Sequence, residues 1–340
     1  MDFLHLIPGT IFMRPYVFLF FAAFLLVAVP HLGWKRVMSF TVIGYLIAFC
    51  SEYASIHTGF PYGWYSYIDK TSSLELWVAG VPFFDSLSFV FLCYCSFATA
   101  LFILSPLKTT GRGSLLILET RALRGSLSTL MLGALLQTYL DIIIDPVALR
   151  GERWFLGKFY TYHEVGPHFG IPLTNYVGWF FVSLVMIYVL QRMTSSLGLS
   201  ARPPAGVCYF RNSGLLPVLL YLGIMAFNLT IALMIGEETI AVTGILTVLL
   251  PFVMVSLLAY QRLDQHSRKE LDEHLRDIPW SPAGGRSRTK TVLKPVTPEE
   301  IGVPLLDFQR KPRQHTLIDT IPRRSMKRNG KINGYRNNRQ

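Results

Sequence analysis

Seven apolar runs, each close to the length of a membrane span, constrain this chain more than any other feature. A helix needs about 20 mostly apolar residues to cross the hydrocarbon core of a bilayer. Only 16% of the residues are charged, whereas about a quarter are charged in a soluble domain. We therefore predict an all-α, polytopic integral membrane protein whose transmembrane domain covers residues 1–260. The predicted spans are residues 13–31, 36–52, 82–104, 126–145, 173–190, 215–235 and 239–260.

Residues 261–340 differ in composition from the rest of the chain. They hold 18 Lys and Arg against 9 Asp and Glu, and so supply +9 of the net charge of +11. Large apolar residues are few there, which predicts a basic and mostly disordered tail. Such a tail is attracted to anionic lipid at the cytoplasmic face of a membrane. Binding to nucleic acid is not predicted, because nothing in the tail indicates a folded basic face.

Basic residues also predict how the spans are oriented, because positively charged loops stay in the cytoplasm. The loops after the first, third and fifth spans are net positive, and the tail emerges on the same side. We therefore expect the N-terminus outside and the C-terminus in the cytoplasm of the cell inner (plasma) membrane. The basic loop residues are Lys35, Arg36, Lys108, Arg112, Arg121, Arg124, Arg192, Arg202 and Arg211.

In this orientation the carboxylates of the spans gather at the outer face. Glu52 ends the second span and Asp85 begins the third. Asp141 and Asp145 close the fourth span, share a helix face, and precede Pro146, which we expect to stop the helix. Ionisable groups at membrane depth are costly and are functional candidates. Because like charges and desolvation both disfavour ionisation, we expect at least one of the two aspartic acids to be protonated near neutral pH.

Two aromatic loops, residues 53–81 and 146–172, lie on that face and resemble each other. Each has a glycine and tyrosine segment, GWYSY at 63–67 and GKFYTY at 157–162. Each then reaches Gly-aliphatic-Pro, at 80–82 and 170–172, before the next span. The likeness predicts a duplicated two-helix unit whose loops face each other over one site. Chance likeness between aromatic loops is the alternative.

Each candidate side chain also has a plainer interpretation. The carboxylates could sit in headgroup water or pair with Arg150 or Arg153, and Asp85 could cap a helix. The loop histidines could relay a proton or only make interfacial hydrogen bonds. Aromatic residues occur at every membrane interface, although their faces also stabilise cations. The cysteines show no metal-ligand spacing and are expected to act as small hydrophobes. The loop histidines are His57, His163 and His168.

The motifs between about residues 40 and 190 resemble the carotenoid-biosynthesis membrane protein family, which includes carotenoid 1,2-hydratases acting on γ-carotene and bisanhydrobacterioruberin. The motifs are Glu52 followed by TGFPYGWYSY, then AGVP, LDIIIDPVALR and HFGIPLTNYVGWF. The resemblance implies addition of water across the terminal double bond of an acyclic (ψ) carotenoid end group. Protonation would give a tertiary carbocation, and water would capture it. Asp85 and the two histidines of HEVGPHFG depart from the expected pattern.

The resemblance and the residue chemistry together give the predicted site. No metal and no cofactor are expected. The predicted partners are an apolar carotenoid, water, membrane lipids and other enzymes of the carotenoid pathway. The catalytic candidates are Glu52, Asp141, Asp145 and His163. The substrate-binding candidates are Gly59, Pro61, Gly63, Trp64, Tyr65, Tyr67, Tyr160, Tyr162, Gly170, Pro172 and Asn175.

Three other functions fit parts of the sequence. A cyclase of ψ end groups begins with the same protonation, so only product analysis separates ring closure from water capture. A prenyltransferase would hold diphosphate and Mg²⁺ with the DIIID segment at 141–145, but such enzymes resemble one another in having two Asp-rich motifs and only one is found. A carotenoid or lipid carrier is expected to have broken helices at mid-membrane, whereas Gly and Pro here fall in loops.

Overall fold

The computed structural model describes residues 3–284, except 112 and 198–201. The chain divides into two units, residues 1–288 and 289–340, and the second lies outside the described residues. The prediction of a mostly disordered tail concerns residues 261–340, so its part from residue 285 onward also lies outside them.

Within the described residues, seven helices are long and apolar enough to cross a membrane, which confirms the predicted fold class. These helices are α2 (Pro15–Leu32), α3 (Trp34–Thr58), α4 (Phe83–Leu104), α6 (Leu127–Ala148), α7 (Leu173–Thr194), α8 (Leu216–Met234) and α9 (Glu238–Arg262). The shorter helices are α1 (Phe3–Met13), α5 (Arg121–Arg124) and α10 (Arg268–Asp277). Single 3-10 turns cover Asp69–Thr71, Gly151–Arg153, Ser213–Leu215 and Pro282–Gly284.

The local sequence explains where several of these helices begin and end. Pro15 opens α2, where its missing amide donor costs nothing. Ser126 caps α6 because its hydroxyl accepts a hydrogen bond from the backbone N–H of Thr129 (3.1 Å). Gly59 ends α3 in the left-handed conformation, with φ of 74°, which glycine adopts without steric cost.

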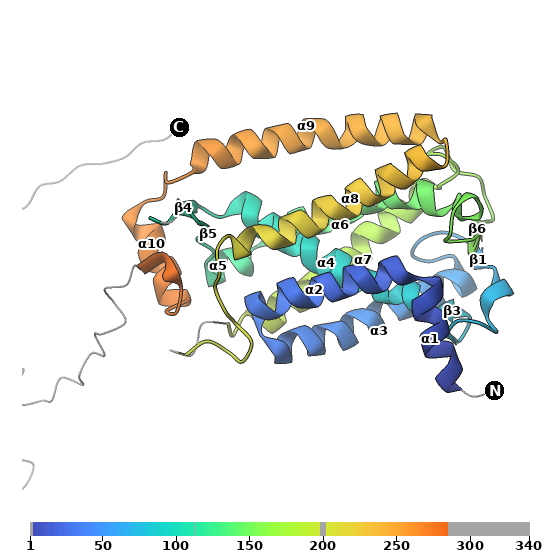
Figure 1. The fold of residues 1–340 in the computed structure, drawn as a ribbon, viewed down its shortest axis with the longest axis horizontal. Coiled ribbons are helices and arrows are strands. Elements are labelled where there is room, and N and C mark those ends of the chain that lie inside the picture. Colours follow the sequence, from blue (N-terminus) through green and yellow to red (C-terminus); the bar gives the residue numbers. More distant parts are fainter. Residues whose placement is uncertain (1–2, 112, 198–201, 285–340) are drawn as a thin grey trace, which may run out of the picture. The chain divides into compact units, whose positions relative to one another are not determined.

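Helix α4 lies inside the bundle, among α2, α3, α6, α7 and α8 (Figure 1). Most of its side chains are buried, and Cys93, Tyr94 and Cys95 are completely so. A helix that is apolar all round is typical of such an enclosed position. Helix α9 lies along the outer side of α8, and most of its side chains are exposed.

The two aromatic loops meet at one end of the bundle. Strand β1 (Tyr65–Tyr67) pairs antiparallel with β6 (Tyr160–Tyr162), so that Tyr65 lies opposite Tyr162 and Tyr67 opposite Tyr160. A second small ladder joins β2 (Trp77–Val78) to β3 (Val81–Pro82). The prediction that the two loops face each other is confirmed by the β1–β6 pairing.

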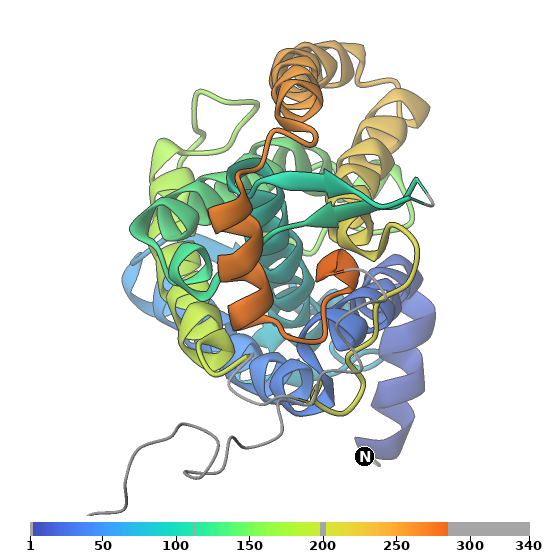
Figure 2. The ribbon, with the colours of Figure 1, turned by 90° about the vertical axis from the view of Figure 1, so that its left-hand side faces the viewer.

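The opposite end carries the β4–β5 hairpin, Leu107–Thr109 with Leu115–Ile117, and the helix α10 (Figure 2). His274 of α10 is buried, and its ring nitrogens bond to the backbone oxygen of Glu119 (2.7 Å) and to Ser281 Oγ (2.7 Å). Residues 268–284 are therefore folded, although they belong to the predicted tail.

Candidate functional site

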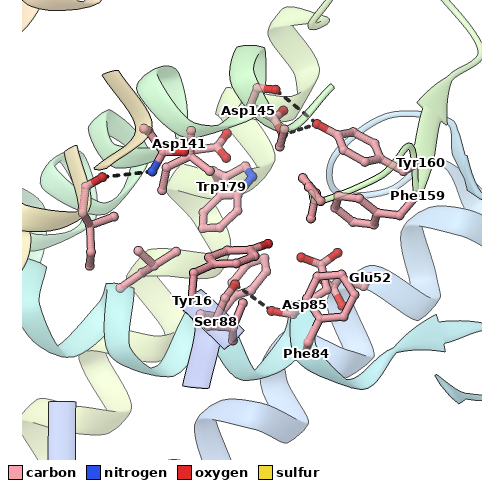
Figure 3. Close-up of a pocket in the computed structure, with 18 of the residues that line it drawn as sticks. Tyr16, Glu52, Phe84, Asp85, Ser88, Asp141, Asp145, Phe159, Tyr160 and Trp179 are labelled. Atoms are coloured by element: carbon pink, nitrogen blue, oxygen red, sulfur yellow. Dashed lines mark hydrogen bonds between the residues drawn. The ribbon is translucent and has the colours of Figure 1, made fainter. Parts of the chain in front are cut away.

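A cavity of about 120 Å³ lies at the end of the bundle where β1 and β6 pair. One water needs about 10–15 Å³ of such space, so the cavity has room for several waters or for the end of an isoprenoid chain. Four carboxylic side chains line it, and the described lining residues include no Lys, Arg or His. Figure 3 shows Asp141 and Asp145 on one side, with Glu52 and Asp85 facing them from the other.

Asn175, near the start of α7, holds the two aspartic acids together. Its side-chain amide donates to Asp141 Oδ2 (2.8 Å) and to Asp145 Oδ2 (2.9 Å). Two carboxylates that share one donor nitrogen repel each other, and a proton on one of them removes the repulsion. The arrangement is therefore suited to passing a proton between Asp141 and Asp145.

Asp145 has two further donors from the β6 strand. The hydroxyl of Tyr160 donates to Asp145 Oδ1 (2.6 Å), and the hydroxyl of Tyr162 donates to Oδ2 (2.8 Å). Burial raises the pKa of both phenols well above the ordinary 10.0, and the neighbouring Asp145 raises it further. Both phenols therefore remain donors at neutral pH. Asp141 is 2% exposed and has Asn175 as its donor.

The facing carboxyls, Glu52 and Asp85, also accept hydrogen bonds from neighbouring hydroxyls. Glu52 on α3 is 2% exposed, and Ser86 Oγ donates to its Oε2 (2.6 Å). The hydroxyl of Tyr67 donates to Asp85 Oδ2 (2.7 Å). Burial raises the pKa of Tyr67 well above 10.0, and Asp85 and Glu52 raise it further, so this phenol also stays protonated.

Two predicted helix ends near these acids were wrong. Helix α3 continues from Glu52 to Thr58, because the first residue that breaks it is Gly59. Helix α6 continues through Pro146 to Ala148. A proline in the last turn forfeits its own hydrogen bond without preventing that turn from closing. Glu52 consequently lies inside its helix and faces neighbouring helices instead of standing at a helix terminus.

Strand geometry decides which loop residues reach the cavity. Alternate residues of a strand point to opposite faces, and the lining residues Tyr65, Tyr67, Tyr160 and Tyr162 share one face. The predicted catalytic residue His163 is exposed on the other face, where its Nε2 lies 2.7 Å from Ser66 Oγ. The predicted binding residue Trp64 stacks on that imidazole, with ring centroids 6.1 Å apart. The structure therefore places His163 and Trp64 outside the cavity.

The predicted glycines and prolines shape the loops without lining the cavity. At Gly59 an added Cβ would lie 2.6 Å from an indole ring, so the close approach of that ring requires glycine. Pro61 and Gly63 continue this turn into β1, Gly63 with φ of 96°. Gly170, with φ of 97°, and Pro172 lead directly into α7. These residues position the side chains of the cavity by setting the course of the backbone.

Aromatic rings form much of the remaining wall. Trp179 of α7 stacks on Phe89 of α4, with centroids 4.1 Å apart and planes 6° apart. Arg14 lies over the Phe84 ring, 4.3 Å from its centroid, but its charge is balanced by Glu75 at 2.8 Å. Ring faces of this kind stabilise cations. The cavity is thus acidic and aromatic at once.

Arg150 and Arg153 pair with Glu237 and not with the aspartic acids. Arg150 Nε lies 3.1 Å from Glu237 Oε1, and Arg153 contacts the same carboxylate. The expected alternative, in which these arginines neutralise Asp141 and Asp145, is therefore not observed among the described residues.

Sequence reasoning gave Asp85 only a weak role, yet it lines the cavity. One sequence signal pointed to it: Asp85 stands three residues after Pro82, as Asn175 stands three residues after Pro172. Tyr16 of α2 and Asn228 of α8 also line the cavity. No sequence motif pointed to these two, because their helices come from outside the repeated units.

The chain belongs to the carotenoid biosynthesis protein family, whose model matches residues 12–251. No curated protein and no solved structure matches the chain. Family membership and the seven apolar helices together assign the protein to carotenoid biosynthesis in a membrane.

Proposed function

We propose that this member of the carotenoid biosynthesis family hydrates the terminal double bond of an acyclic (ψ) carotenoid end group. The observation that supports this reaction best is the convergence of four carboxylic side chains and several aromatic rings in one cavity. Hydration of an alkene needs a proton donor, a surface that tolerates a carbocation, and an acceptor for the proton that water loses. The cavity offers all three.

Asp141 is the proton donor in this proposal. It is buried and has one donor, Asn175, whereas Asp145 accepts hydrogen bonds from Asn175, Tyr160 and Tyr162. Hydrogen bonds to a carboxylate favour its charged form, and burial of a charge without such bonds is costly. We therefore assign the proton to Asp141 and the negative charge to Asp145.

The reaction balances without a redox partner. The π bond breaks as one alkene carbon takes the proton of Asp141, which leaves a tertiary carbocation on the next carbon. Water adds its oxygen to that carbon and loses a proton to Asp145. Transfer of this proton from Asp145 to Asp141, within the pair that Asn175 joins, restores the starting state.

The rest of the cavity must stabilise the carbocation. General acid catalysis contributes about 10²–10⁴-fold, so charge stabilisation has to supply much of the remaining acceleration. Trp179 presents an aromatic face, and Glu52 and Asp85 present carboxyls from the opposite wall. We propose that these groups face the cation, while the loop side admits water.

We further propose that the cavity lies at the extracytoplasmic end of the protein. The first turn of α3, which contains Lys35 and Arg36, lies with the β4–β5 hairpin at the opposite end of the helices. By the preference of positive loops for the cytoplasm, that opposite end is cytoplasmic. Reporter fusions after residues 67 and 110 test this orientation. A reporter that is active only outside the cytoplasm should be active after residue 67 and inactive after residue 110, and a reporter that is active only in the cytoplasm should show the reverse.

Expression in a lycopene-producing host tests the reaction. Pigment that gains the mass of one water at an end, in a cell fraction containing the protein, is the expected result. A ring-closed isomer of unchanged mass would show a cyclase instead, and unmodified pigment that co-purifies with the protein would show a carrier. The Asp141→Asn variant, checked for its presence in the membrane, should yield no hydrated pigment.

A further inference from the structure

Gln137 of α6 is a buried polar side chain that takes no part in the proposed reaction. It is 0% exposed, and neither its amide nitrogen nor its amide oxygen has a hydrogen-bond partner in residues 3–284 outside the gaps at 112 and 198–201. Buried polar groups in proteins nearly always have partners, and burial without one is costly. A methionine of the same length would avoid this cost, so the amide indicates a partner in some other state of the site.

Gln137 lies on the helix face that carries the two aspartic acids. Gln137, Asp141 and Asp145 follow one another at intervals of four residues, so they lie one above the other on α6. The Cα–Cβ bonds of a helix tilt toward its N-terminus, which brings the carboxyl of Asp141 toward Gln137. Glutamine and aspartate at this spacing can form a hydrogen bond across one helix turn.

Packing on α7 encloses this face on both sides of Gln137. At Gly133, one turn earlier, an added Cβ would lie 2.8 Å from Ile187 Cδ1 of α7. One turn later, Asn175 of α7 donates to Asp141 (2.8 Å). Gln137 thus lies between two levels at which α6 meets α7, and its amide has no exposed surface at which to bond to solvent. Its next neighbour along the face, on the side of the cavity, is Asp141.

The proposed reaction creates a charge for which the site has few donors. When Asp141 gives its proton to the alkene, Asp141 and Asp145 are both carboxylates. Asp145 accepts hydrogen bonds from Tyr160, Tyr162 and Asn175, whereas Asp141 accepts one among the described residues, from the same Asn175. Each hydrogen bond to a carboxylate favours its charged form. A second donor to Asp141 would therefore stabilise the site at the step in which the carbocation exists.

We propose that Gln137 is a positioning residue that donates an amide N–H to Asp141 once Asp141 has lost its proton. The inference rests on the proposed function in taking Asp141 as the proton donor, and it gives Gln137 no contact with the substrate. While Asp141 is protonated, the amide has no partner, and ionisation of Asp141 supplies one. The hydrogen bond is released when Asp145 returns the proton, so the same amide serves every turnover.

Infrared spectroscopy of the carboxyl groups tests this inference without turnover. The C=O band of protonated Asp141 is the one that Asp141→Asn removes, and its intensity is followed with pH in lipid nanodiscs without substrate. Gln137→Met keeps the length of the side chain and removes the donor. The pH at which half of the band is lost, here called the half-loss pH, should rise by about one unit or more in Gln137→Met, because a hydrogen bond to a charged group is lost.

Two variants on neighbouring helices serve as controls. Ser183 of α7 and Thr99 of α4 also have buried hydroxyls without a partner among the described residues. Ser183→Ala and Thr99→Val remove these hydroxyls but leave the side chain one turn from Asp141 in place, and should not change the half-loss pH. An unchanged half-loss pH in Gln137→Met, or an equal rise in either control, would overturn the proposal.

Melting temperature and activity separate the remaining outcomes. Because Gln137 has no partner while Asp141 is protonated, Gln137→Met should melt no lower than wild type at a pH where the Asp141 band is complete. Its hydration rate should be about tenfold lower, because the ionised Asp141 has lost a donor. A lower melting temperature with an unchanged half-loss pH means that Gln137 only supports the fold, which contradicts the inference. A raised half-loss pH in a protein that hydrates no alkene contradicts the proposed function but supports the hydrogen bond.

Discussion

The two helix–loop–helix units of this protein share a backbone design but differ in the chemistry they bring to the cavity. In both, Gly-aliphatic-Pro precedes the second helix, and the glycine and the residue before it have positive φ, namely 46° and 83° at Ala79 and Gly80 and 53° and 97° at Phe169 and Gly170. Three residues after the proline, the first unit has Asp85 and the second has Asn175.

This one difference changes how the acids are held. The amide of Asn175 donates to both Asp141 and Asp145, which helix spacing already places side by side. The carboxyl of Asp85 has no N–H groups to donate. It accepts a hydrogen bond from the hydroxyl of Tyr67, and Glu52 accepts one from the hydroxyl of Ser86. The comparison indicates that the backbone repeat brings the third residue after the proline to the cavity, and that the side chain there decides whether two acids share one donor.

The largest expected effect comes from removing the proposed proton donor, Asp141. Asp141→Asn should lower the hydration rate by about 10²–10⁴-fold, the usual contribution of a general acid. Hydrated carotenoid formed in isolated membranes is the measurement. Asp69→Asn, which changes an exposed acid at the same end, should have no effect. A rate close to wild type for Asp141→Asn would contradict the assignment.

The next largest effect is expected from a variant that removes the difference between the two units. Asn175→Asp makes the second unit match the first and replaces a double donor by a third acid. Loss of hydrogen bonds to charged groups costs about 1.5–3 kcal/mol, so the rate should fall about 10- to 100-fold. Because Asn175 acts through the pair, the acidic limb of the pH–rate profile should shift as well. An unshifted profile would mean that Asn175 only supports the fold.

The reciprocal change should cost less. Asp85→Asn makes the first unit match the second, and the side chain can still accept the hydrogen bond of Tyr67. The change removes one ionisable group that faces Asp141 and Asp145 across the cavity and takes no part in the proposed proton transfers, so we expect a decrease of about tenfold or less. A larger loss of rate than in Asp141→Asn would indicate that the proton donor lies on the wall of Asp85 and not on that of Asp141.

The smallest effects concern the phenols of β6. Tyr160→Phe removes one of three side-chain donors to Asp145 and leaves Tyr162 and Asn175 in place. Because the two remaining donors offset part of the loss, hydration should slow about fivefold, which is below the full value of a hydrogen bond to a charged group. Burial and Asp145 raise the pKa of Tyr160 and Tyr162 above 10.0, so both stay protonated as pH rises to that value. Wild type and Tyr160→Phe should therefore share the same alkaline limb below pH 10. An alkaline limb that disappears in the variant would show that this phenol ionises during the reaction.

Much of the fold and part of the site were already determined by the sequence. The seven helices followed from run length, because a span must satisfy its own backbone in lipid. The shared face of Asp141 and Asp145 followed from helix period, and the meeting of the two loops followed from their repeated motifs. These features depend on local geometry or on internal likeness, and both can be read along a chain.

Only the tertiary structure decided which groups face one another. It placed Asp85 and Glu52 opposite Asp141 and Asp145, left His163 outside, and bound Arg150 to Glu237. Lateral packing of helices brings together residues far apart in sequence, and helix period does not fix which neighbour a face meets. For the same reason no sequence motif pointed to Tyr16 and Asn228, which line the cavity from helices outside the two repeated units.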